Sequence, residues 1–429
     1  MTIVFVVLFG LMLLGVPVAF AILSSGMAYL FTTGTSILMV AQRLVYGLNS
    51  FTLLAVPLFI LVGNLMDFGG ISKRLTDWAK SLLGWLPGGL GIVTVFSCAI
   101  FAALTGSGPA TVAAIGSIML PSMIKSGYSK ETSAGLVAAA GALGPIIPPS
   151  IPMIIYGVTM NLSIPAMFVA GVVPGIVIAI VLSLVNVVFA YRNPEVIKHA
   201  GTMKFNLKES LRLFWKALGA LGLPVLILGG IYGGVFTPTE SAAVGIVYAL
   251  VVGFALKELK VKDLPRILIA SLKTSTMVNF IIAAASLFSW VISKSQIGGV
   301  ISEGFINLVG GSQAMYLLVL VIVLLIVGCL MDNVAATLIL APILIPVGIS
   351  LGCNELHIGM LFCICLVAGF VTPPFGYNLF TAVSISGLNF KQIVKGVIPF
   401  MCAEILLLFV FAYVPGIITW LPAMAGYTF

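Results

Sequence analysis

Apolar residues fill long uninterrupted stretches of this 429-residue chain, and polar residues gather in short segments between them. The first 26 residues, MTIVFVVLFGLMLLGVPVAFAILSSG, are typical. About 20 apolar residues suffice for a helix to cross the hydrocarbon core of a bilayer. The strands of a membrane barrel would instead alternate polar and apolar positions. The pattern therefore predicts an all-α polytopic membrane protein.

Composition supports this class, since 61% of the residues are hydrophobic and only 7% are charged, against about 25% charged in a soluble domain. The N-terminus lacks the positive region that opens a signal peptide, so we interpret it as a first membrane segment. The six cysteines are scattered through apolar stretches, which favours buried, inert thiols over a metal or redox site.

Two apolar stretches contain adjacent prolines: GPIIPPSIPMII at 144–155 and GFVTPPFGYNLF at 369–380. Proline removes a backbone donor and clashes with the preceding turn, so a helix breaks there. We predict broken helices at about 131–160 and 356–386. Unwound backbone inside a membrane leaves carbonyl groups free, and such carbonyls coordinate cations in transporters.

The two breaks belong to an internal repeat with a constant shift of 225 residues, which aligns Gly144 with Gly369 and both proline pairs. Pro121 and Pro174 align with Pro346 and Pro399 at the same shift. We predict repeats at 51–175 and 280–400. Scaffold helices at 1–50, scaffold helices with a cytoplasmic linker at 176–279 and a C-terminal helix at 401–429 complete the chain. Within the linker, the pattern suggests an amphipathic surface helix near 207–216.

Basic residues give each repeat an orientation. The net charge is +8, and 18 of the 20 Lys and Arg fall in five groups, at 73–80, 125–130, 192–216, 257–273 and 391–395. The positive-inside rule places these groups in the cytoplasm, so the charge does not indicate nucleic-acid binding. Segments that are basic in one copy lack Lys and Arg in the other, which predicts an inverted-topology repeat. Only Arg43 and Lys294 lie outside the groups.

Each repeat also contains a polar tip between two apolar arms: LTGSGPATVAA at 104–114 and LMDNVAATLIL at 330–340. A Gly/Ser/Thr tip does not suit lipid but suits a pocket inside protein. We therefore predict two re-entrant helical hairpins, at about 87–121 and 313–346, that enter from opposite faces. By length, the segment of the first hairpin could instead form two full membrane spans. Tips facing unwound segments would form two cation sites beside a central substrate site.

Asp332 is the most informative side chain, because a carboxylate within a membrane segment is costly and indicates function. Its alternative role is to cap the second hairpin arm. Ser107 and Thr372 lie beside backbone breaks as candidate ligands. Glu240 fits a helix N-cap. Glu404 either lines an interface with a partner subunit or is held inside the protein by a neighbouring residue. For Arg43 an interfacial anchor competes with recognition of an anionic substrate or a partner. No HExxH or paired intramembrane Asp occurs, so we predict no enzyme activity.

The stretches TGSGPATVAAIGSIMLP, GPIIPPS, GGIYGGVFTPTESAAV and GFVTPPFGYNLF together resemble the large membrane subunit of tripartite ATP-independent periplasmic (TRAP) transporters across essentially the whole chain. The resemblance implies an elevator mechanism with a rigid scaffold and a mobile transport domain in the bacterial inner membrane. It also implies a sodium gradient as driving force, with Na⁺ as coupling ion and no other cofactor. The implied partners are a small four-helix membrane subunit and a periplasmic substrate-binding protein.

The resemblance also assigns residues by position. One sodium site would use Thr105, Ser107, Gly108, Gly144, Ile147 and Pro149, and the other Asp332, Asn333, Gly369 and Thr372. Substrate would lie near Ser150, Asn333, Thr372 and Phe375. The family moves organic acids such as C4-dicarboxylates or sialic acid. Because the hairpins contain no Arg or Lys, bound sodium and the positive ends of half-helices would have to balance the carboxylate.

The sequence thus predicts sodium-coupled import of an organic anion delivered by a binding protein. The closest alternative is a stand-alone carboxylate transporter or ion antiporter of similar architecture, which would need no binding protein. A channel or a structural membrane partner is the alternative of a different class, and downhill flux without sodium coupling would be its sign.

Overall fold

The computed structural model describes residues 2–200, 205–295 and 297–428, and within these ranges every regular element is a helix. Among the described residues, seven helices are long and apolar enough to cross a membrane, judged by length and composition. They are α10 (Ile164–Tyr191), α12 (Leu207–Tyr232), α13 (Pro238–Ala255), α14 (Leu264–Lys294, with the short turn before it), α16 (Gln313–Leu330), α17 (Asn333–Ser350) and α20 (Phe390–Tyr413). The number rises to eight if α3 (Leu38–Leu48) and α4 (Ala55–Phe68), bent by 70°, form one span.

The other described helices are shorter or less apolar than these spans. They are α1 (Thr2–Leu13), α2 (Val18–Thr33), α5 (Ile71–Leu83), α6 (Gly89–Thr105), α7 (Gly108–Lys125), α8 (Lys130–Gly141), α9 (Ile151–Met160), α11 (Pro194–Ala200), α15 (Ile297–Val309), α18 (Glu355–Ala368), α19 (Tyr377–Ser386) and α21 (Gly416–Met424). Short 3₁₀ turns stand at Thr52–Leu54, Val261–Asp263 and Gly369–Val371.

The same order of helices occurs in both halves at the spacing found in the sequence. α7 and α17 begin at Gly108 and Asn333 and end at Lys125 and Ser350, 225 residues apart at both ends. α8 and α18 begin at the same separation, and α6 and α16 end at it. In each half the helical run then stops, at Gly141 or at Val371, and resumes after the paired prolines at Ile151 or Tyr377.

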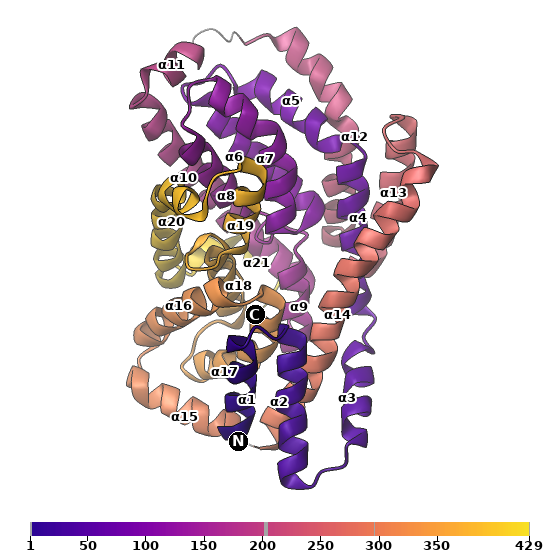
Figure 1. Ribbon diagram of the computed structural model, residues 1–429, viewed down its shortest axis with the longest axis vertical. Helices are drawn as coiled ribbons and strands as arrows, with labels where there is room; N and C mark the ends of the chain where they lie inside the picture. Colours follow the sequence, from indigo (N-terminus) through magenta and orange to yellow (C-terminus); the bar gives the residue numbers. More distant parts are fainter. Residues whose placement is uncertain (1, 201–204, 296, 429) are drawn as a thin grey trace.

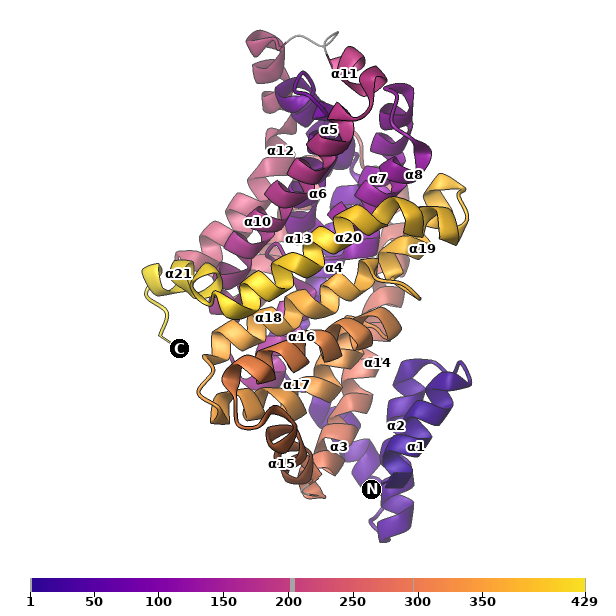
Figure 2. The ribbon, with the colours of Figure 1, turned by 90° about the vertical axis from the view of Figure 1, so that its left-hand side faces the viewer.

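Equivalent helices of the two halves lie at opposite ends of the molecule. α5, which precedes the α6–α7 pair, lies at the upper end in Figure 1, and α15, which precedes the α16–α17 pair, lies at the lower end. The upper end also holds α11 and the start of α12, where one of the basic groups falls. Figure 2 shows the same separation of α5 from α15.

The two halves interlock in the centre of the molecule. α7 packs against α19 of the other half, and α17 packs in the same way against α9. α20 lies along α8 and α18 (Figure 2). α8 from Ser133 to Gly141 and α18 from Leu356 to Ala368 are buried at every residue, so both helix breaks begin from the interior.

Capping residues explain several helix starts. Ser129 accepts a hydrogen bond from the backbone N–H of Thr132 at the start of α8, and Asn354 does the same for His357 at α18. Glu240 and Thr237 form a reciprocal capping box at α13, which confirms the capping role predicted for Glu240. The predicted surface helix at 207–216 is instead the first part of the continuous helix α12.

Candidate functional site

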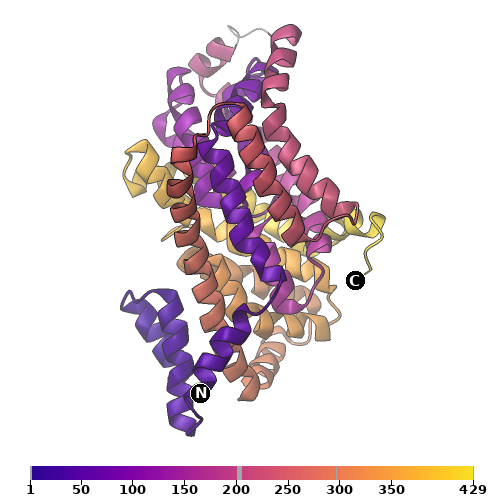
Figure 3. The same cartoon turned by 90° about the vertical axis from the view of Figure 1, so that its right-hand side faces the viewer.

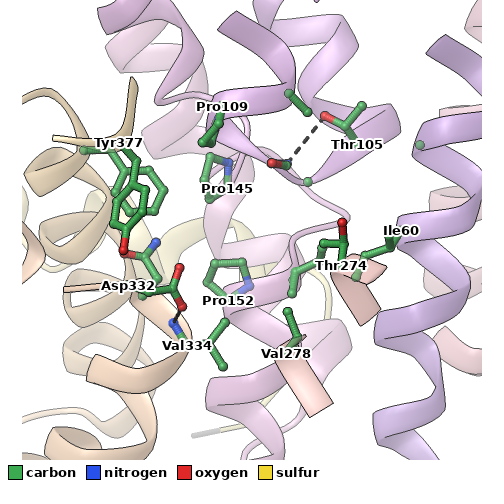
Figure 4. Close-up of a pocket in the computed structure, with 18 of the residues that line it drawn as sticks. Ile60, Thr105, Pro109, Pro145, Pro152, Thr274, Val278, Asp332, Val334 and Tyr377 are labelled. Atoms are coloured by element: carbon green, nitrogen blue, oxygen red, sulfur yellow. Dashed lines mark hydrogen bonds between the residues drawn. The ribbon is translucent and has the colours of Figure 1, made fainter. Parts of the chain in front are cut away.

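A cavity of about 270 Å³ lies where both tips meet the broken helices (Figure 4). The first tip contributes residues 105–110, the second tip contributes residues 332–334, and α4 and α14 form the opposite wall. The first residues of α7, α9, α17 and α19 all line this cavity: Gly108, Ile151, Asn333 and Tyr377. Because a helix N-terminus carries a partial positive charge and free N–H groups, the four helices together favour negative charge in the cavity.

Hydroxyl groups and close backbone packing hold the first tip. Thr111 Oγ1 donates to the Ser107 carbonyl at 2.8 Å and lies 3.3 Å from Thr105 Oγ1. Gly106 ends α6 with φ +60, and a Cβ there would lie 2.9 Å from the Pro149 carbonyl oxygen. A Cβ on Gly144 would lie 2.6 Å from the Ser107 carbonyl oxygen. The first break therefore packs directly against the first tip.

Side chains define the second tip. The Asp332 carboxylate caps α17 by accepting from the backbone N–H of Val334 at 2.9 Å (Figure 4), which is the alternative role foreseen for it. Asn333 is 2% exposed, and neither atom of its amide has a partner among the described residues. A buried polar group without a partner is costly and calls for a ligand or another explanation. Asn333 is thus the strongest structural sign of ligand binding here.

The second break packs against the end of α16, just before the second tip. Gly369 packs against Gly328 of α16, where a Cβ would lie 2.2 Å from the Gly328 carbonyl carbon. Thr372 Oγ1 donates to the Ala368 carbonyl at 2.9 Å. Phe375 is 53% exposed. Thr372 and Phe375 therefore do not line the cavity that Asp332 lines.

Five of the twelve residues predicted as ligands line the cavity, namely Thr105, Ser107, Gly108, Asp332 and Asn333. The other seven do not: Gly144, Ile147, Pro149, Ser150, Gly369, Thr372 and Phe375. Ser150 is fully buried; its hydroxyl donates to the Pro145 carbonyl and accepts from Met153 N–H at 3.4 Å. Its side chain therefore already has local partners.

Several polar residues of the cavity wall were not predicted. Asn64 and Asp67 of α4 and Thr274 of α14 face the tips across the cavity. Asn64 Nδ2 donates to Ser271 Oγ at 2.8 Å, and Asp67 accepts from the Ser72 hydroxyl at 3.1 Å. The signal that could have found Asn64 and Asp67 is their spacing of three residues on one helix.

Asn378 of α19 contacts the first tip from the other half. Its Nδ2 donates to the Ala138 carbonyl at 3.0 Å, whereas its buried Oδ1 has no partner among the described residues. A Cβ on Gly108 would lie 2.8 Å from that Oδ1. Glu404, by contrast, is buried on α20 outside the cavity lining.

The described lining offers oxygen ligands and no basic side chain. Backbone carbonyls, hydroxyls, two amides and two carboxylates suit a hard monovalent cation. A search of the described residues finds no group of three or more His, Cys, Asp or Glu able to hold a metal ion. An anion in this cavity would meet helix N-termini and bound cations instead of Arg or Lys.

Comparison with known proteins identifies relatives across nearly the whole chain. Residues 5–417 match the family model described as "Tripartite ATP-independent periplasmic transporter, DctM component". The chain is 40% identical over 405 residues to the C4-dicarboxylate TRAP transporter large permease protein DctM of Pseudomonas aeruginosa, covering 94% of each chain. It is 33% identical over 420 residues to the sialic acid TRAP transporter large permease protein SiaM of Vibrio cholerae, covering 97% of this chain and 96% of the relative.

A third relative is longer than this chain. The isethionate TRAP transporter permease protein DctMQ of Oleidesulfovibrio alaskensis is 38% identical over 418 residues, and the match covers 96% of this chain but 65% of the relative. Among solved structures, MtrF of Neisseria gonorrhoeae and the YdaH transporter of Alcanivorax borkumensis share the fold, each with a TM-score of 0.61. Their identities are 15% and 14%, and they cover 91% and 94% of this chain and 85% and 89% of their own.

Proposed function

Because the chain belongs to the DctM family of tripartite ATP-independent periplasmic transporters, we propose that it imports an organic acid by sodium-coupled secondary transport across a bacterial inner membrane. The relatives are named as permeases, so the chain is a membrane transport protein and not an enzyme. The observation that supports carboxylate transport best is the convergence of four helix N-termini on one cavity without a basic side chain.

Two sodium ions would bind beside the carboxylate. At the first tip the ligands are Thr105, Ser107 and Gly108, with carbonyls from the adjoining segment at Gly144, Ile147 and Pro149. At the second tip they are Asp332, Asn333, Gly369 and Thr372, and the break moves toward the tip when the ion binds. The substrate lies between the ions, near Ser150, Asn333, Thr372 and Phe375. The unpartnered amide of Asn333 supports this assignment.

The transport step is an elevator movement of the two interlocked halves against the scaffold. The α6–α7 and α16–α17 pairs act as re-entrant hairpins entering from opposite faces, which agrees with the opposite positions of α5 and α15 in Figure 2. α4 and α14 form the wall past which the loaded cavity moves. Sodium binds before substrate and permits the loaded domain to cross.

A small four-helix membrane subunit and a periplasmic substrate-binding protein complete the proposed system. The named substrates of the relatives, C4-dicarboxylates, sialic acid, isethionate and 2,3-diketo-L-gulonate, define the class of anions to test. A stand-alone sodium-coupled carboxylate transporter or ion antiporter remains the second candidate, because YdaH and MtrF share this fold.

Uptake of labelled organic acids into proteoliposomes tests the proposal. The chain is reconstituted with its small subunit, and uptake is followed with an inward sodium gradient, a potassium gradient of equal size, or sodium plus an ionophore. We expect accumulation of one acid only with the sodium gradient and only with the binding protein. Equal uptake under potassium would reject sodium coupling, and full uptake without the binding protein would favour the stand-alone transporter.

A further inference from the structure

Arg43 and Lys294, the two basic residues outside the cytoplasmic groups, stack on the same indole ring. The Arg43 guanidinium lies 5.3 Å from the Trp290 ring centroid, and the Lys294 ammonium lies 4.8 Å from it. Arg43 also lies 5.6 Å from the Tyr46 ring. Within the described residues the only ion pair is Arg74–Glu258, so neither cation is neutralised by an acid. Two uncompensated cations so close together create a strongly positive local potential.

In this cation pair on Trp290, Arg43 lies in the middle of α3 and Lys294 is the last residue of α14. α3 lies in the lower part of the molecule, away from α5 and α11 (Figure 1). α3 and α14 pack closely there, as Figure 3 shows. A Cβ on Gly47 would lie 2.4 Å from Ser286 Cβ, so the two helices nearly touch one turn from the cations. By the positive-inside rule, this end faces the periplasm.

A second cavity, of about 350 Å³, is lined by Tyr46, whose ring lies 5.6 Å from the Arg43 guanidinium. We call it the outer cavity. It is lined by Tyr46, Gly47, Asn49, Ser50 and Leu53 before α4, by Ser286 and Ser289 of α14, and by parts of α9 and α17. The described lining contains hydroxyl and amide groups but no acidic side chain. Such groups donate hydrogen bonds to a carboxylate without repelling it.

Three helices connect the outer cavity with the cavity at the tips. α14 lines the inner cavity at Thr274 and Val278 and the outer cavity from Ile282 to Ser289. α9 lines the inner cavity at Pro152 and the outer cavity from Ile155, and α17 lines the inner cavity at Val334 and the outer cavity at Leu338. Only about one helical turn separates the two cavities on each helix. The residues that line the two cavities on either side of this division are apolar and form an apolar barrier: Val278, Ile282, Pro152, Ile155, Val334 and Leu338.

We propose that the outer cavity is an external receiving site for the carboxylate anion, with the cation pair as its electrostatic funnel. The inference rests on the proposed direction of transport. Arg43 and Lys294 raise the local anion concentration, and the hydroxyl and amide groups replace water on the carboxylate. The apolar barrier separates the anion from the inner cavity until the elevator movement brings that cavity to the outer one. This assigns Arg43 the anion-recognition role that the sequence left as an alternative.

Quenching of Trp290 fluorescence tests the site without transport. The other four tryptophans, Trp78, Trp85, Trp215 and Trp420, are replaced by phenylalanine, and the protein is reconstituted with its small subunit in neutral phosphatidylcholine vesicles. We expect iodide to quench Trp290 about 3-fold less efficiently in the Arg43→Gln/Lys294→Gln variant, with quenching by neutral acrylamide unchanged. Succinate, an anion of the proposed class, should reduce iodide quenching in the parent protein only.

Uptake with the native tryptophans provides the second measurement. Arg43→Gln with Lys294→Gln should raise KM about 10-fold at low salt and leave kcat unchanged, and the difference should shrink as ionic strength rises. Arg43→Lys should restore most of the affinity. The matched control is Arg266→Gln, since Arg266 lies 5.5 Å from the Phe68 ring near the other end of α14 and should keep the parent KM.

Three outcomes would overturn the receiving site. If iodide quenched the parent and the double variant equally, the cation pair would not attract anions, even where sodium-driven uptake is normal. A quenching difference seen in anionic vesicles but not in neutral ones assigns the cations to a lipid headgroup. An unchanged KM with a lower kcat assigns them to movement of the domain. If sodium coupling itself failed in the uptake assay, the quenching result would still hold, because it does not depend on transport. Failure of the proposed function is thereby distinguished from failure of the receiving site.

Discussion

The first tip, Thr105–Gly108, and the second tip, Leu330–Asn333, occupy equivalent places in the two halves, but different groups hold them. In the first, Thr105 and Thr111 form a hydroxyl pair and Gly144 packs against the Ser107 backbone. In the second, these positions are Leu330, Ala336 and Asp332, and the break packs against α16 instead. The comparison teaches that backbone packing and hydroxyl groups hold the first tip, whereas a capping carboxylate and a buried amide define the second.

The largest expected effect is at the charged side chain. Asp332→Asn keeps the helix cap, because asparagine also caps well, but removes the negative ligand. We expect about 3 kcal/mol weaker sodium binding, or about 100-fold, and loss of sodium-driven uptake. Sodium binding is measured by isothermal calorimetry on the purified protein and uptake in proteoliposomes.

Asp77→Asn is the control, since Asp77 lies on α5 and does not line the cavity. It should keep the parent sodium affinity. If Asp332→Asn retained normal sodium dependence, the second tip would not be an ion site, and the difference between the two repeats would concern packing only.

An intermediate effect is expected at the backbone contact of the first repeat. Gly144→Ala places a Cβ 2.6 Å from the Ser107 carbonyl oxygen, and backbone cannot move aside cheaply. Overpacking of this kind costs about 1–3 kcal/mol, so we expect the sodium concentration at half-maximal uptake to rise about 10-fold. Gly229→Ala, with no atom within 4 Å of its Cβ, is the control, and equal behaviour of the two variants would refute the contact's role.

The smallest effect is expected from the hydroxyl network of the first tip. Thr111→Val removes the hydrogen bond to the Ser107 carbonyl with little change in shape, which costs about 1 kcal/mol and raises half-saturation by sodium about 5-fold. Thr76→Val is matched, because the buried Thr76 donates to Ser72 O in the same way on α5. A larger effect of Thr76→Val on sodium would contradict the assignment.

Much of the fold could be predicted because apolar length, Gly and Pro act locally. The all-helical membrane class and the family follow from such signals, and the breaks fall where the proline pairs stand. Residues 207–216 were predicted as a separate surface helix, whereas α12 continues to Tyr232. The pattern of polar and apolar residues indicates which face of a helix is buried, but it does not indicate where the helix ends. Pro224 is accommodated inside α12.

The cavity could be predicted only in part. Asp332 and Asn333 stand out as polar residues in an apolar stretch, so sequence alone names the tips. Asn64, Asp67 and Thr274 reach the cavity through the rotation of α4 and α14, which depends on packing between distant segments. The converse holds for Ser150, whose sequence context resembles a ligand position although its hydroxyl has local partners.

The reciprocal packing of α7 on α19 and of α9 on α17 also affects how the protein is made. Asn378 bonds to Ala138, 240 residues earlier in the chain. At about 5–20 residues per second, roughly 10–50 s of translation separate the two. During that interval α7 and α8 lack the packing contacts that α19 and α20 give them in the complete fold. The N-terminal half therefore completes its packing only after α19 and α20 have been made.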